Sequence, residues 1–225
     1  MFSLKNVSVN FGEFTALHNI NCNINENDFI LILGHNGAGK TTLFDSVSGK
    51  ITPTSGKIFR NTQDITKMSE MNRAKFMSRV FQNTYLGLVA TMTVAENLAM
   101  ALLKTKNAGF KKAIKNYPEY LVEETLKPLG LRLEMHLNTP IGQLSGGQRQ
   151  IITIIMATLC EPDILLLDEP TAALDPVSTE NLLQFVHNFT KNRKIATLMI
   201  THDEQKAQFL ATRLWKLNKG ELIEI

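Results

Sequence analysis

Three short apolar runs mark the regular core of this chain. They span Phe29–Leu33, Asp163–Leu167 and Ile195–Ile200, and they consist mainly of leucine, isoleucine and other apolar residues. Continuous apolar runs of this length, bounded by turn residues, predict buried strands. Each run is followed by glycine or polar residues, so the candidate functional residues lie where the predicted strands end.

The pattern between these runs changes twice. Up to about residue 82, short apolar stretches alternate with turns and predict an antiparallel β subdomain with strands at Leu4–Val9, Leu17–Ile24 and Ser55–Phe59. The pattern then turns helical, with helices expected at Val94–Leu103, Glu119–Leu129 and Gln148–Leu159. The 225 residues suit one α/β domain, residues 1–225, whose core is interrupted by a helical subdomain at about 83–158.

A glycine-rich loop joins the first apolar run to a predicted helix. Residues 34–41, GHNGAGKT, fit the P-loop pattern G-x-x-x-x-G-K-[ST], in the strand–loop–helix context that this motif requires. Lys40 would reach the β- and γ-phosphates of a nucleotide, and the Thr41 hydroxyl would bind Mg²⁺. The predicted nucleotide contacts in this loop are Gly34, Asn36, Gly37, Gly39, Lys40, Thr41 and Thr42.

Polar side chains also follow the other two runs. Asp168 and Glu169 end the second run, and His202 follows the third. Adjacent side chains of a strand point in opposite directions, but both carboxylates can face one site because the strand ends there. Between the P-loop and these carboxylates lies LSGGQ, residues 144–148, whose serine and glycines suit a helix N-terminus that presents N–H groups to an anion.

The order of these motifs resembles that of the ATP-binding cassette (ABC) family. GHNGAGKT, LSGGQ, ILLLDE and TH follow one another along the chain, and the resemblance covers essentially all of it. It implies a P-loop NTPase with a RecA-like core, an antiparallel β subdomain and an inserted helical subdomain. It also implies that the chain binds ATP and Mg²⁺ and hydrolyses the ATP.

The resemblance assigns a role to each residue expected near the γ-phosphate. Asp168 would hold Mg²⁺ through water, and Glu169 would be the general base that polarises the attacking water. His202 would contact the γ-phosphate and orient that water. Gln82, at the Q-loop position, would ligate Mg²⁺ weakly and would join the core to the helical subdomain.

An aromatic ring is expected against the adenine. Phe11 stands where the family usually has a tyrosine, and stacking requires only an aromatic face. Phe14 is close in sequence and could take the same role, and the other interpretation of Phe11 is a core phenylalanine.

The family pattern further implies that one copy is not a complete machine. The chain has one P-loop and one LSGGQ motif. In the family, Ser145, Gly147 and Gln148 would complete the ATP site of a second protomer, arranged head to tail, and Asp175 at the D-loop position would span that interface. The second cassette must therefore come from another chain, as a homodimer or as a pair of different cassettes.

Composition indicates the class of partner, the state of the cysteines and the cellular location. The chain has 24 Lys+Arg against 21 Asp+Glu, and a net charge of +3 argues against nucleic acid as a partner. Cys22 and Cys160 lie among apolar residues and predict reduced, buried thiols. No signal peptide or run of about 20 apolar residues occurs, so we expect a cytoplasmic protein that reaches the membrane through a partner.

The segment after Gln82 suggests that partner. Tyr85–Ala90 is apolar, and Thr93–Leu98 matches the T-V-x-E-N pattern of transporter cassettes. In the family, this region forms the groove that receives a coupling helix from the membrane subunit, and an exposed apolar patch would mark such a site. The first hypothesis is therefore an ATPase subunit bound to transmembrane permease subunits. The alternatives are a non-transport ABC ATPase and, against the evidence of LSGGQ, a P-loop kinase.

Less specific resemblances suggest the direction of transport and the transported substrate. A compact single-cassette chain resembles the subunits of prokaryotic importers, which would work with a solute-binding protein. Phe81–Ala101, Thr139–Leu159 and Thr197–His202 resemble a small group of cassettes assigned to the uptake of amino acids, tryptophan or tyrosine among them. The alternative is a cassette of an export or lipoprotein-release system. Five lysines of the helical insert predict a solvated face, or else contact with lipid headgroups: Lys104, Lys106, Lys111, Lys112 and Lys115.

Overall fold

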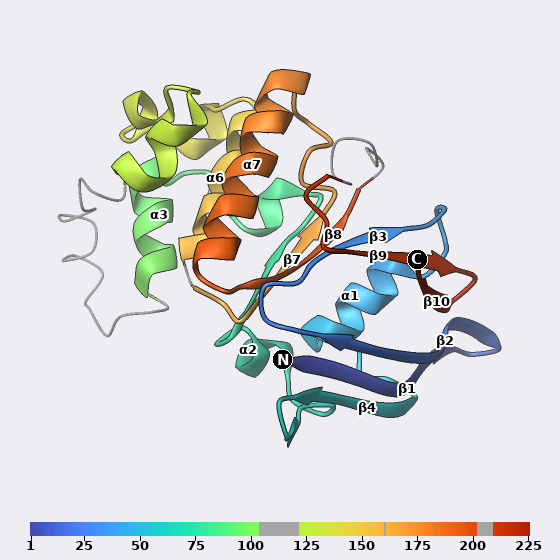
Figure 1. The fold of residues 1–225 in the computed structure, drawn as a ribbon. Helices are drawn as coiled ribbons and strands as arrows, with labels where there is room; N and C mark the ends of the chain where they lie inside the picture. Colours follow the sequence, from blue (N-terminus) through green and yellow to red (C-terminus); the bar gives the residue numbers. More distant parts are fainter. Residues whose placement is uncertain (104–121, 160, 202–208) are drawn as a thin grey trace.

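Two β-sheets with one helix between them form the base of the molecule (Figure 1). The computed structural model describes residues 1–103, 122–159, 161–201 and 209–225. The first sheet is antiparallel, in the order β2-β1-β4-β5, and confirms the predicted antiparallel strands. Its members are β1 (Phe2–Phe11), β2 (Phe14–Ile24), β4 (Ser55–Arg60) and β5 (Gln63–Asp64).

The second sheet is central and almost entirely parallel. Its order is β10-β9-β3-β8-β7-β6, and only the edge strand β10 runs antiparallel to its neighbour. The three strands predicted from apolar runs lie side by side in its middle and are almost fully buried. The strands are β3 (Phe29–Leu33), β6 (Met77–Val80), β7 (Ile164–Asp168), β8 (Ala196–Ile200), β9 (Arg213–Asn218) and β10 (Glu221–Glu224).

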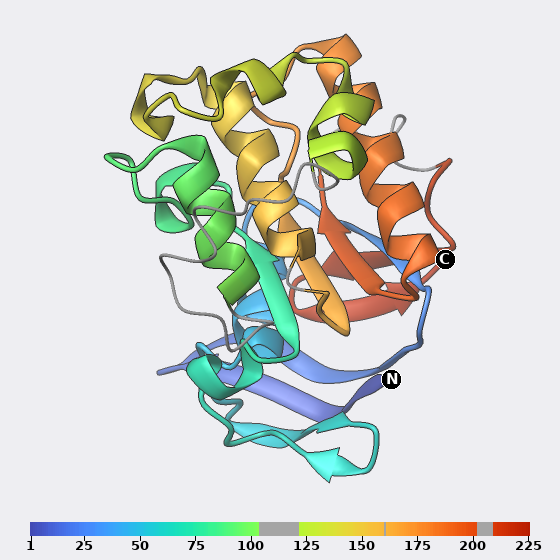
Figure 2. The ribbon, with the colours of Figure 1, turned by 90° about the vertical axis from the view of Figure 1, so that its left-hand side faces the viewer.

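Each face of the central sheet has its own apolar core. Helix α1 (Lys40–Ser48) lies between the two sheets, where Phe44 and Val47 pack with residues of both. Helices α6 (Gly146–Leu159) and α7 (Pro176–Asn192) cover the opposite face, and α3 (Val94–Leu103) packs beside α6 (Figure 2). The mixed α/β fold with two sheets agrees with the fold class expected from the motifs.

The segment between β6 and β7 differs in detail from the sequence expectation. Helix α6 begins two residues earlier than predicted, at Gly146. The described part of the helix predicted at Glu119–Leu129 is a π-helical turn at Val122–Leu126 and a 3₁₀ turn at Lys127–Leu129. Pro128 lacks a backbone N–H and restricts the residue before it, which explains why an α-helix does not continue there.

The expectations for the lysine cluster and for Cys160 cannot be compared with the described structure, whereas the expectation on membrane-spanning helices can. The five lysines between 104 and 115, and also Cys160, lie outside the described residues. Within the described ranges, no helix is long and apolar enough to cross a bilayer.

A buried arginine ties α1 to the segment that follows β5. Arg73, at the end of helix α2 (Glu70–Arg73), has no exposed surface. Its guanidinium donates to the carbonyl oxygens of Ser46 and Val47 in the last turn of α1. It also donates to three carbonyl oxygens on the other side, those of Ile65, Thr66 and Met68. Burial lowers the pKa of Arg73 to about 10, which still leaves the group charged at neutral pH.

We expect Arg73→Met to destabilise the chain by about 3–5 kcal/mol, because several buried carbonyl oxygens would lose their donor at once. Arg73→Lys should also be less stable than the wild type, since one ammonium cannot replace the planar set of donors on the guanidinium. Urea unfolding measures the effect. The exposed Lys75, two residues away, provides the control: Lys75→Met should change the free energy of unfolding by less than about 0.5 kcal/mol. Equal free energies of unfolding for Arg73→Met and Lys75→Met would show that the hydrogen bonds of Arg73 do not stabilise the fold.

Candidate functional site

One cleft lies where neighbouring strands of the central sheet end. In a parallel sheet the carboxyl ends share one edge, and ligands bind outside that edge. The loop after β3, Gln82 after β6, Asp168 and Glu169 at the end of β7, and Ile200 at the end of β8 all line this cleft of about 570 Å³. The other lining residues are Phe14, Ala16, His35, Asn36, Gly37, Gly39, Lys40, Thr41 and Thr42. His202 lies outside the described residues.

The glycine-rich loop has the shape of an anion cradle. Gly39 has a φ of 103° and precedes the first turn of α1, so the helix has no side-chain cap. The N–H groups of that first turn therefore have no partner within the helix and point toward the cleft, where an anion is favoured. A Cβ at Gly39 would lie 2.6 Å from the carbonyl oxygen of Ala16, so only glycine fits beside β2.

Lys40 is held over this cradle. Its side chain is nearly buried, at 8 % exposure. Its ammonium donates to the carbonyl oxygen of Gly34 and, at 3.0 Å, to that of His35. Both acceptors belong to the loop itself, so the positive charge is already positioned beside the N-terminus of α1. Asn36 and Gly37, at the tip of the loop, are exposed to the cleft.

The two carboxylates at the end of β7 differ in environment. Asp168 is 14 % exposed and accepts a hydrogen bond at 3.4 Å from Arg79 on β6. Burial raises the pKa of Asp168 above its usual value, although the neighbouring Arg79 guanidinium opposes that shift. Arg79 also pairs at 2.5 Å with Asp45 of α1. Sequence reasoning missed both Arg79 and Asp45, and the available signal was a charged residue within the short strand Met77–Val80.

Glu169 adopts a backbone conformation that a glutamate rarely takes. Its φ is 51°, and its N–H donates at 2.9 Å to the carbonyl oxygen of Ile200 on the neighbouring strand. The side-chain amide of Gln82 donates to Glu169 Oε2 at 3.1 Å. Left-handed backbone at such a residue persists only where its surroundings hold it, and it turns both Asp168 and Glu169 toward the cleft.

The two candidate rings for adenine sit at the tip of one hairpin. Phe11 ends β1 and pairs with Phe14 at the start of β2. Both rings are largely exposed, at 51 % and 62 %. Phe14 lines the cleft, and Phe11 lies outside its lining. The lining therefore favours Phe14, while the prediction of Phe11 from the family pattern stays a prediction.

The LSGGQ segment lies apart from this cleft. None of the cleft's described lining residues comes from 144–148. Ser145 and Gln148 form a capping box at the start of α6: Ser145 N–H donates to Gln148 Oε1 at 3.0 Å, and Gln148 N–H donates to Ser145 Oγ at 3.2 Å. A Cβ at Gly147 would lie 2.9 Å from Leu174 Cδ2, so glycine permits the D-loop to pack directly on this turn.

Asp175 caps helix α7 in the described chain. Its Oδ1 accepts from the N–H groups of Val177 and Ser178, each at 3.0 Å, and Ser178 Oγ donates to Oδ2 at 2.6 Å. The hydrogen bond from Ser178 is the main reason that the pKa of Asp175 is lowered. The neighbouring Val177 is 67 % exposed. The D-loop thus presents an ordered helix start with an apolar residue facing outward.

The cleft fits a nucleoside triphosphate with a magnesium ion. An uncapped helix N-terminus and a positioned ammonium complement phosphates. Within the described ranges, no group of three or more His, Cys, Asp or Glu side chains is arranged to hold a metal. Mg²⁺ does not require such a cage, because it binds through one or two carboxylates together with phosphate oxygens and water.

Comparison with known proteins identifies the family. The family model described as "ABC transporter" matches residues 17–172. The chain belongs to the ABC transporter family. It is an ATP-binding cassette, an ATPase whose hydrolysis is coupled to transport.

Its relatives support the same conclusion over the whole chain. A tyrosine transport ATP-binding protein of Clostridioides difficile (strain R20291) is 39% identical, over 99% of this chain and 90% of that protein. A probable sulfate/thiosulfate import ATP-binding protein of Chlorella vulgaris is 35% identical, over 99% of this chain and 89% of that protein. A dimeric ATP-binding cassette in a post-hydrolysis state, bound to ADP and Pi, superposes with a TM-score of 0.83 at 28% identity, over 100% of this chain and 98% of that one.

We expect Lys40→Ala to weaken ATP binding by about 10- to 100-fold, because hydrogen bonds from a charged group contribute about 1.5–3 kcal/mol. Titration of the purified chain with a fluorescent ATP analogue measures the dissociation constant. Lys57→Ala serves as the control, since Lys57 lies on β4 in an exposed pair with Asp64 and should leave the constant unchanged. Wild-type affinity in Lys40→Ala would show that the phosphates bind elsewhere.

Proposed function

We propose that this cassette hydrolyses ATP at a head-to-tail interface with a second cassette and thereby drives solute import across a membrane. The observation that carries the proposal is that the two glycine-rich segments, 34–41 and 144–148, lie apart. The cleft has its own phosphate cradle at 34–41, while the exposed Ser145 and its capping box open onto another surface. The glycine-containing N-terminus of α6 is suited to bind an anion. A nucleotide bound in this chain's own cleft would not reach it, because residues 144–148 do not line that cleft. A second copy would bring its bound ATP to Ser145 and Gly147, with Asp175 and Val177 at the same interface.

The proposed metal ligands come from three elements. Thr41 at the start of α1, Asp168 at the end of β7 and Gln82 after β6 line one cleft and supply the hydroxyl, carboxylate and amide oxygens that Mg²⁺ accepts. Bound there, Mg²⁺ would neutralise charge on the phosphate oxygens. The burial that raises the pKa of Asp168 also leaves its negative charge poorly solvated, which favours a cation beside it.

Glu169 is the proposed general base. It lies beside Asp168 and lines the same cleft, and the side-chain amide of Gln82 donates to its Oε2 at 3.1 Å, which directs the carboxylate into the cleft. A positioned base contributes about 10²–10⁴-fold to a rate. His202 would assist by orienting the water, as the family pattern implies.

Glu169→Gln should bind ATP normally and lower turnover by about 10²–10⁴-fold, since only the base is lost. ATP would then persist in both shared sites, and the variant should form a stable dimer that depends on ATP and Mg²⁺. Size-exclusion chromatography at increasing ATP tests this expectation. Adding Lys40→Ala to the same variant should abolish the dimer. A monomer at saturating ATP would argue against the shared site.

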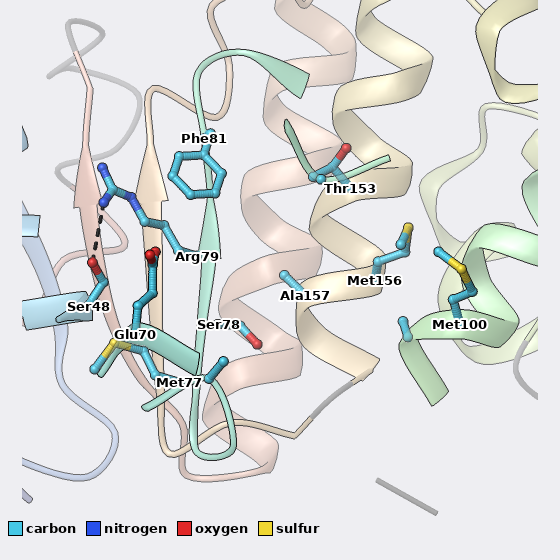
Figure 3. A pocket seen from close by; sticks show the side chains of 13 residues that line it. Ser48, Glu70, Met77, Ser78, Arg79, Phe81, Met100, Thr153, Met156 and Ala157 are labelled. Atoms are coloured by element: carbon cyan, nitrogen blue, oxygen red, sulfur yellow. Dashed lines mark hydrogen bonds between the residues drawn. The ribbon is translucent and has the colours of Figure 1, made fainter. Parts of the chain in front are cut away.

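A groove beside the edge strand β6 is the proposed docking site for a permease helix (Figure 3). It has a volume of about 350 Å³ and lies among β6, α2, α3 and α6. Its walls carry three methionines, whose flexible side chains adapt to a partner's surface. The apolar side chains that line it are Ala74, Met77, Phe81, Met100, Ala101, Met156 and Ala157.

The apolar residues after Gln82 extend this surface. Tyr85 and Leu86 are 53 % and 67 % exposed, and Arg149 of α6 stacks over the Tyr85 ring at 4.8 Å. Leu88 differs from them, because it is half-buried and packs against the core of the helices. Leu86 is therefore the residue to test for docking, whereas a charge at Leu88 would also disturb folding.

Leu86→Glu should prevent assembly with the permease and abolish transport, because a carboxylate buried in an apolar interface costs several kcal/mol. The isolated variant should keep wild-type affinity for ATP. Co-purification with the permease and an uptake assay measure the two effects. Met135→Glu, at an apolar residue that is 74 % exposed elsewhere on the chain, should leave both unchanged. Normal assembly of Leu86→Glu would remove this surface from the docking site.

Amino acids, with tyrosine or tryptophan as the first candidates, are the proposed cargo. The support is the relative from Clostridioides difficile, whose name assigns it to tyrosine transport. The resemblance of Phe81–Ala101 and Thr139–Leu159 to cassettes of amino-acid uptake points the same way. The system would then include permease subunits and a solute-binding protein, with the cassette on the cytoplasmic face of the membrane. Cells that lack this chain should lose uptake of labelled tyrosine or tryptophan, and the wild-type chain, but not Lys40→Ala, should restore it. Unchanged uptake of both amino acids would contradict this cargo without touching the ATPase assignment.

A further inference from the structure

Arg79 is a buried charge beside the cleft that has no part in the chemistry described above. It lies on β6, three residues before Gln82, and its side chain is 6 % exposed. Its guanidinium reaches two carboxylates on different elements. Nη1 donates to Asp45 Oδ1 of α1 at 2.5 Å, and Nη2 donates to Asp168 Oδ2 of β7 at 3.4 Å.

Aromatic rings fix the plane of this guanidinium. The Phe81 ring centroid lies 4.7 Å from Arg79 Cζ, and the Phe44 centroid lies 5.7 Å from it. Figure 3 shows the Arg79 side chain running from β6 past Phe81 toward Ser48, to which Nη1 also donates at 3.5 Å. Stacking restricts rotation of the planar fork, so its donors keep a defined direction. Nε is buried and has no hydrogen-bond partner in the described part of the chain, so the side chain is placed for its Nη contacts.

We propose that Arg79 is a positioning residue for Asp168. It holds Oδ2 of Asp168 and thereby presents the carboxylate to the metal in one orientation. Asp45 fixes the same guanidinium to α1, the helix whose first turn carries Lys40 and Thr41. The phosphate cradle and the metal carboxylate are thus tied together through one side chain. The inference rests on the proposed role of Asp168 at the magnesium site.

The physical basis is the general behaviour of groups that contact metal ligands. A ligating carboxylate is itself hydrogen-bonded in most metal sites, and loss of such a partner costs about 10- to 100-fold in metal affinity. Arg79 suits this task better than a lysine would, because two Nη groups on a rigid plane serve two acceptors at once. Asp45 also contacts Lys50 at 3.5 Å, which helps to balance the second carboxylate of the group.

The test measures metal binding without turnover. Mn²⁺ replaces Mg²⁺ as an electron paramagnetic resonance probe, in the presence of the non-hydrolysable analogue β,γ-imido-ATP. Arg79→Met should raise the Mn²⁺ dissociation constant by about 10- to 100-fold, and Arg79→Lys should give a smaller increase. Nucleotide affinity in EDTA should stay at the wild-type value, because the phosphate cradle is intact.

Two further variants separate positioning from stability. Removing one member of a buried ion group can unfold a domain, so Arg79→Met is also combined with Asp45→Asn, which removes both charges. The double variant should recover the unfolding midpoint and keep the metal defect. Arg60→Met is the matched control: Arg60 pairs at 2.6 Å with Asp163, just before the other end of β7, and its loss should leave Mn²⁺ binding unchanged.

Each outcome decides a specific point. Wild-type Mn²⁺ affinity in the double variant, with binding abolished in Asp168→Asn, would overturn the role of Arg79 and leave the metal site standing. Wild-type affinity in Asp168→Asn would instead remove Asp168 from the metal site, and the proposed function would lose that ligand. An equal loss of nucleotide affinity in EDTA would show that Arg79 supports the whole cleft, which would also overturn the inference.

Discussion

The parallel pairing of β3, β8, β7 and β6 is the constraint on which the cleft depends. These strands are short and largely buried, and all four end at the same edge of the sheet. The register places Asp168 opposite Ile200, and the N–H of Glu169 then bonds to the carbonyl oxygen of Ile200. A shift of one residue would turn every side chain of a strand to the other face, so the apolar pattern and the position of the carboxylates are set together.

Two positively charged side chains lie close to the cleft that the parallel strands form. Carboxylates close to a triphosphate repel it unless cations intervene, and the chain supplies Lys40 on the phosphate side and Arg79 behind Asp168. Arg79 also forms part of the wall of the apolar groove with Phe81, so one side chain lines the groove and contacts Asp168 of the cleft. Phe81 of the groove is also followed directly along the chain by Gln82, which lines the cleft and contacts Glu169.

Sequence reasoning succeeded where a local pattern carries the physics. The apolar runs gave β3, β7 and β8 within a residue, and the glycines of 34–41 gave the loop and the start of α1. It failed where the outcome depends on contacts between distant segments. Nothing local shows that Arg73 meets carbonyl groups of α1, that Arg79 meets Asp45, or that Phe14 rather than Phe11 lines the cleft. The early start of α6 was visible in principle, because S-x-x-Q is a capping pattern.

If LSGGQ of one chain closes the ATP site of another, cysteines placed in the two segments should cross-link between chains. Asn36→Cys and Ser145→Cys are placed on separate chains in the Glu169→Gln background, with Cys160 replaced by alanine. The native Cys22 is half-buried and its pKa is raised to about 12, so it should not react at pH 8. We expect a disulfide between the two chains only in the mixture and only with ATP and Mg²⁺. A mixture that stays uncross-linked at saturating ATP would contradict it.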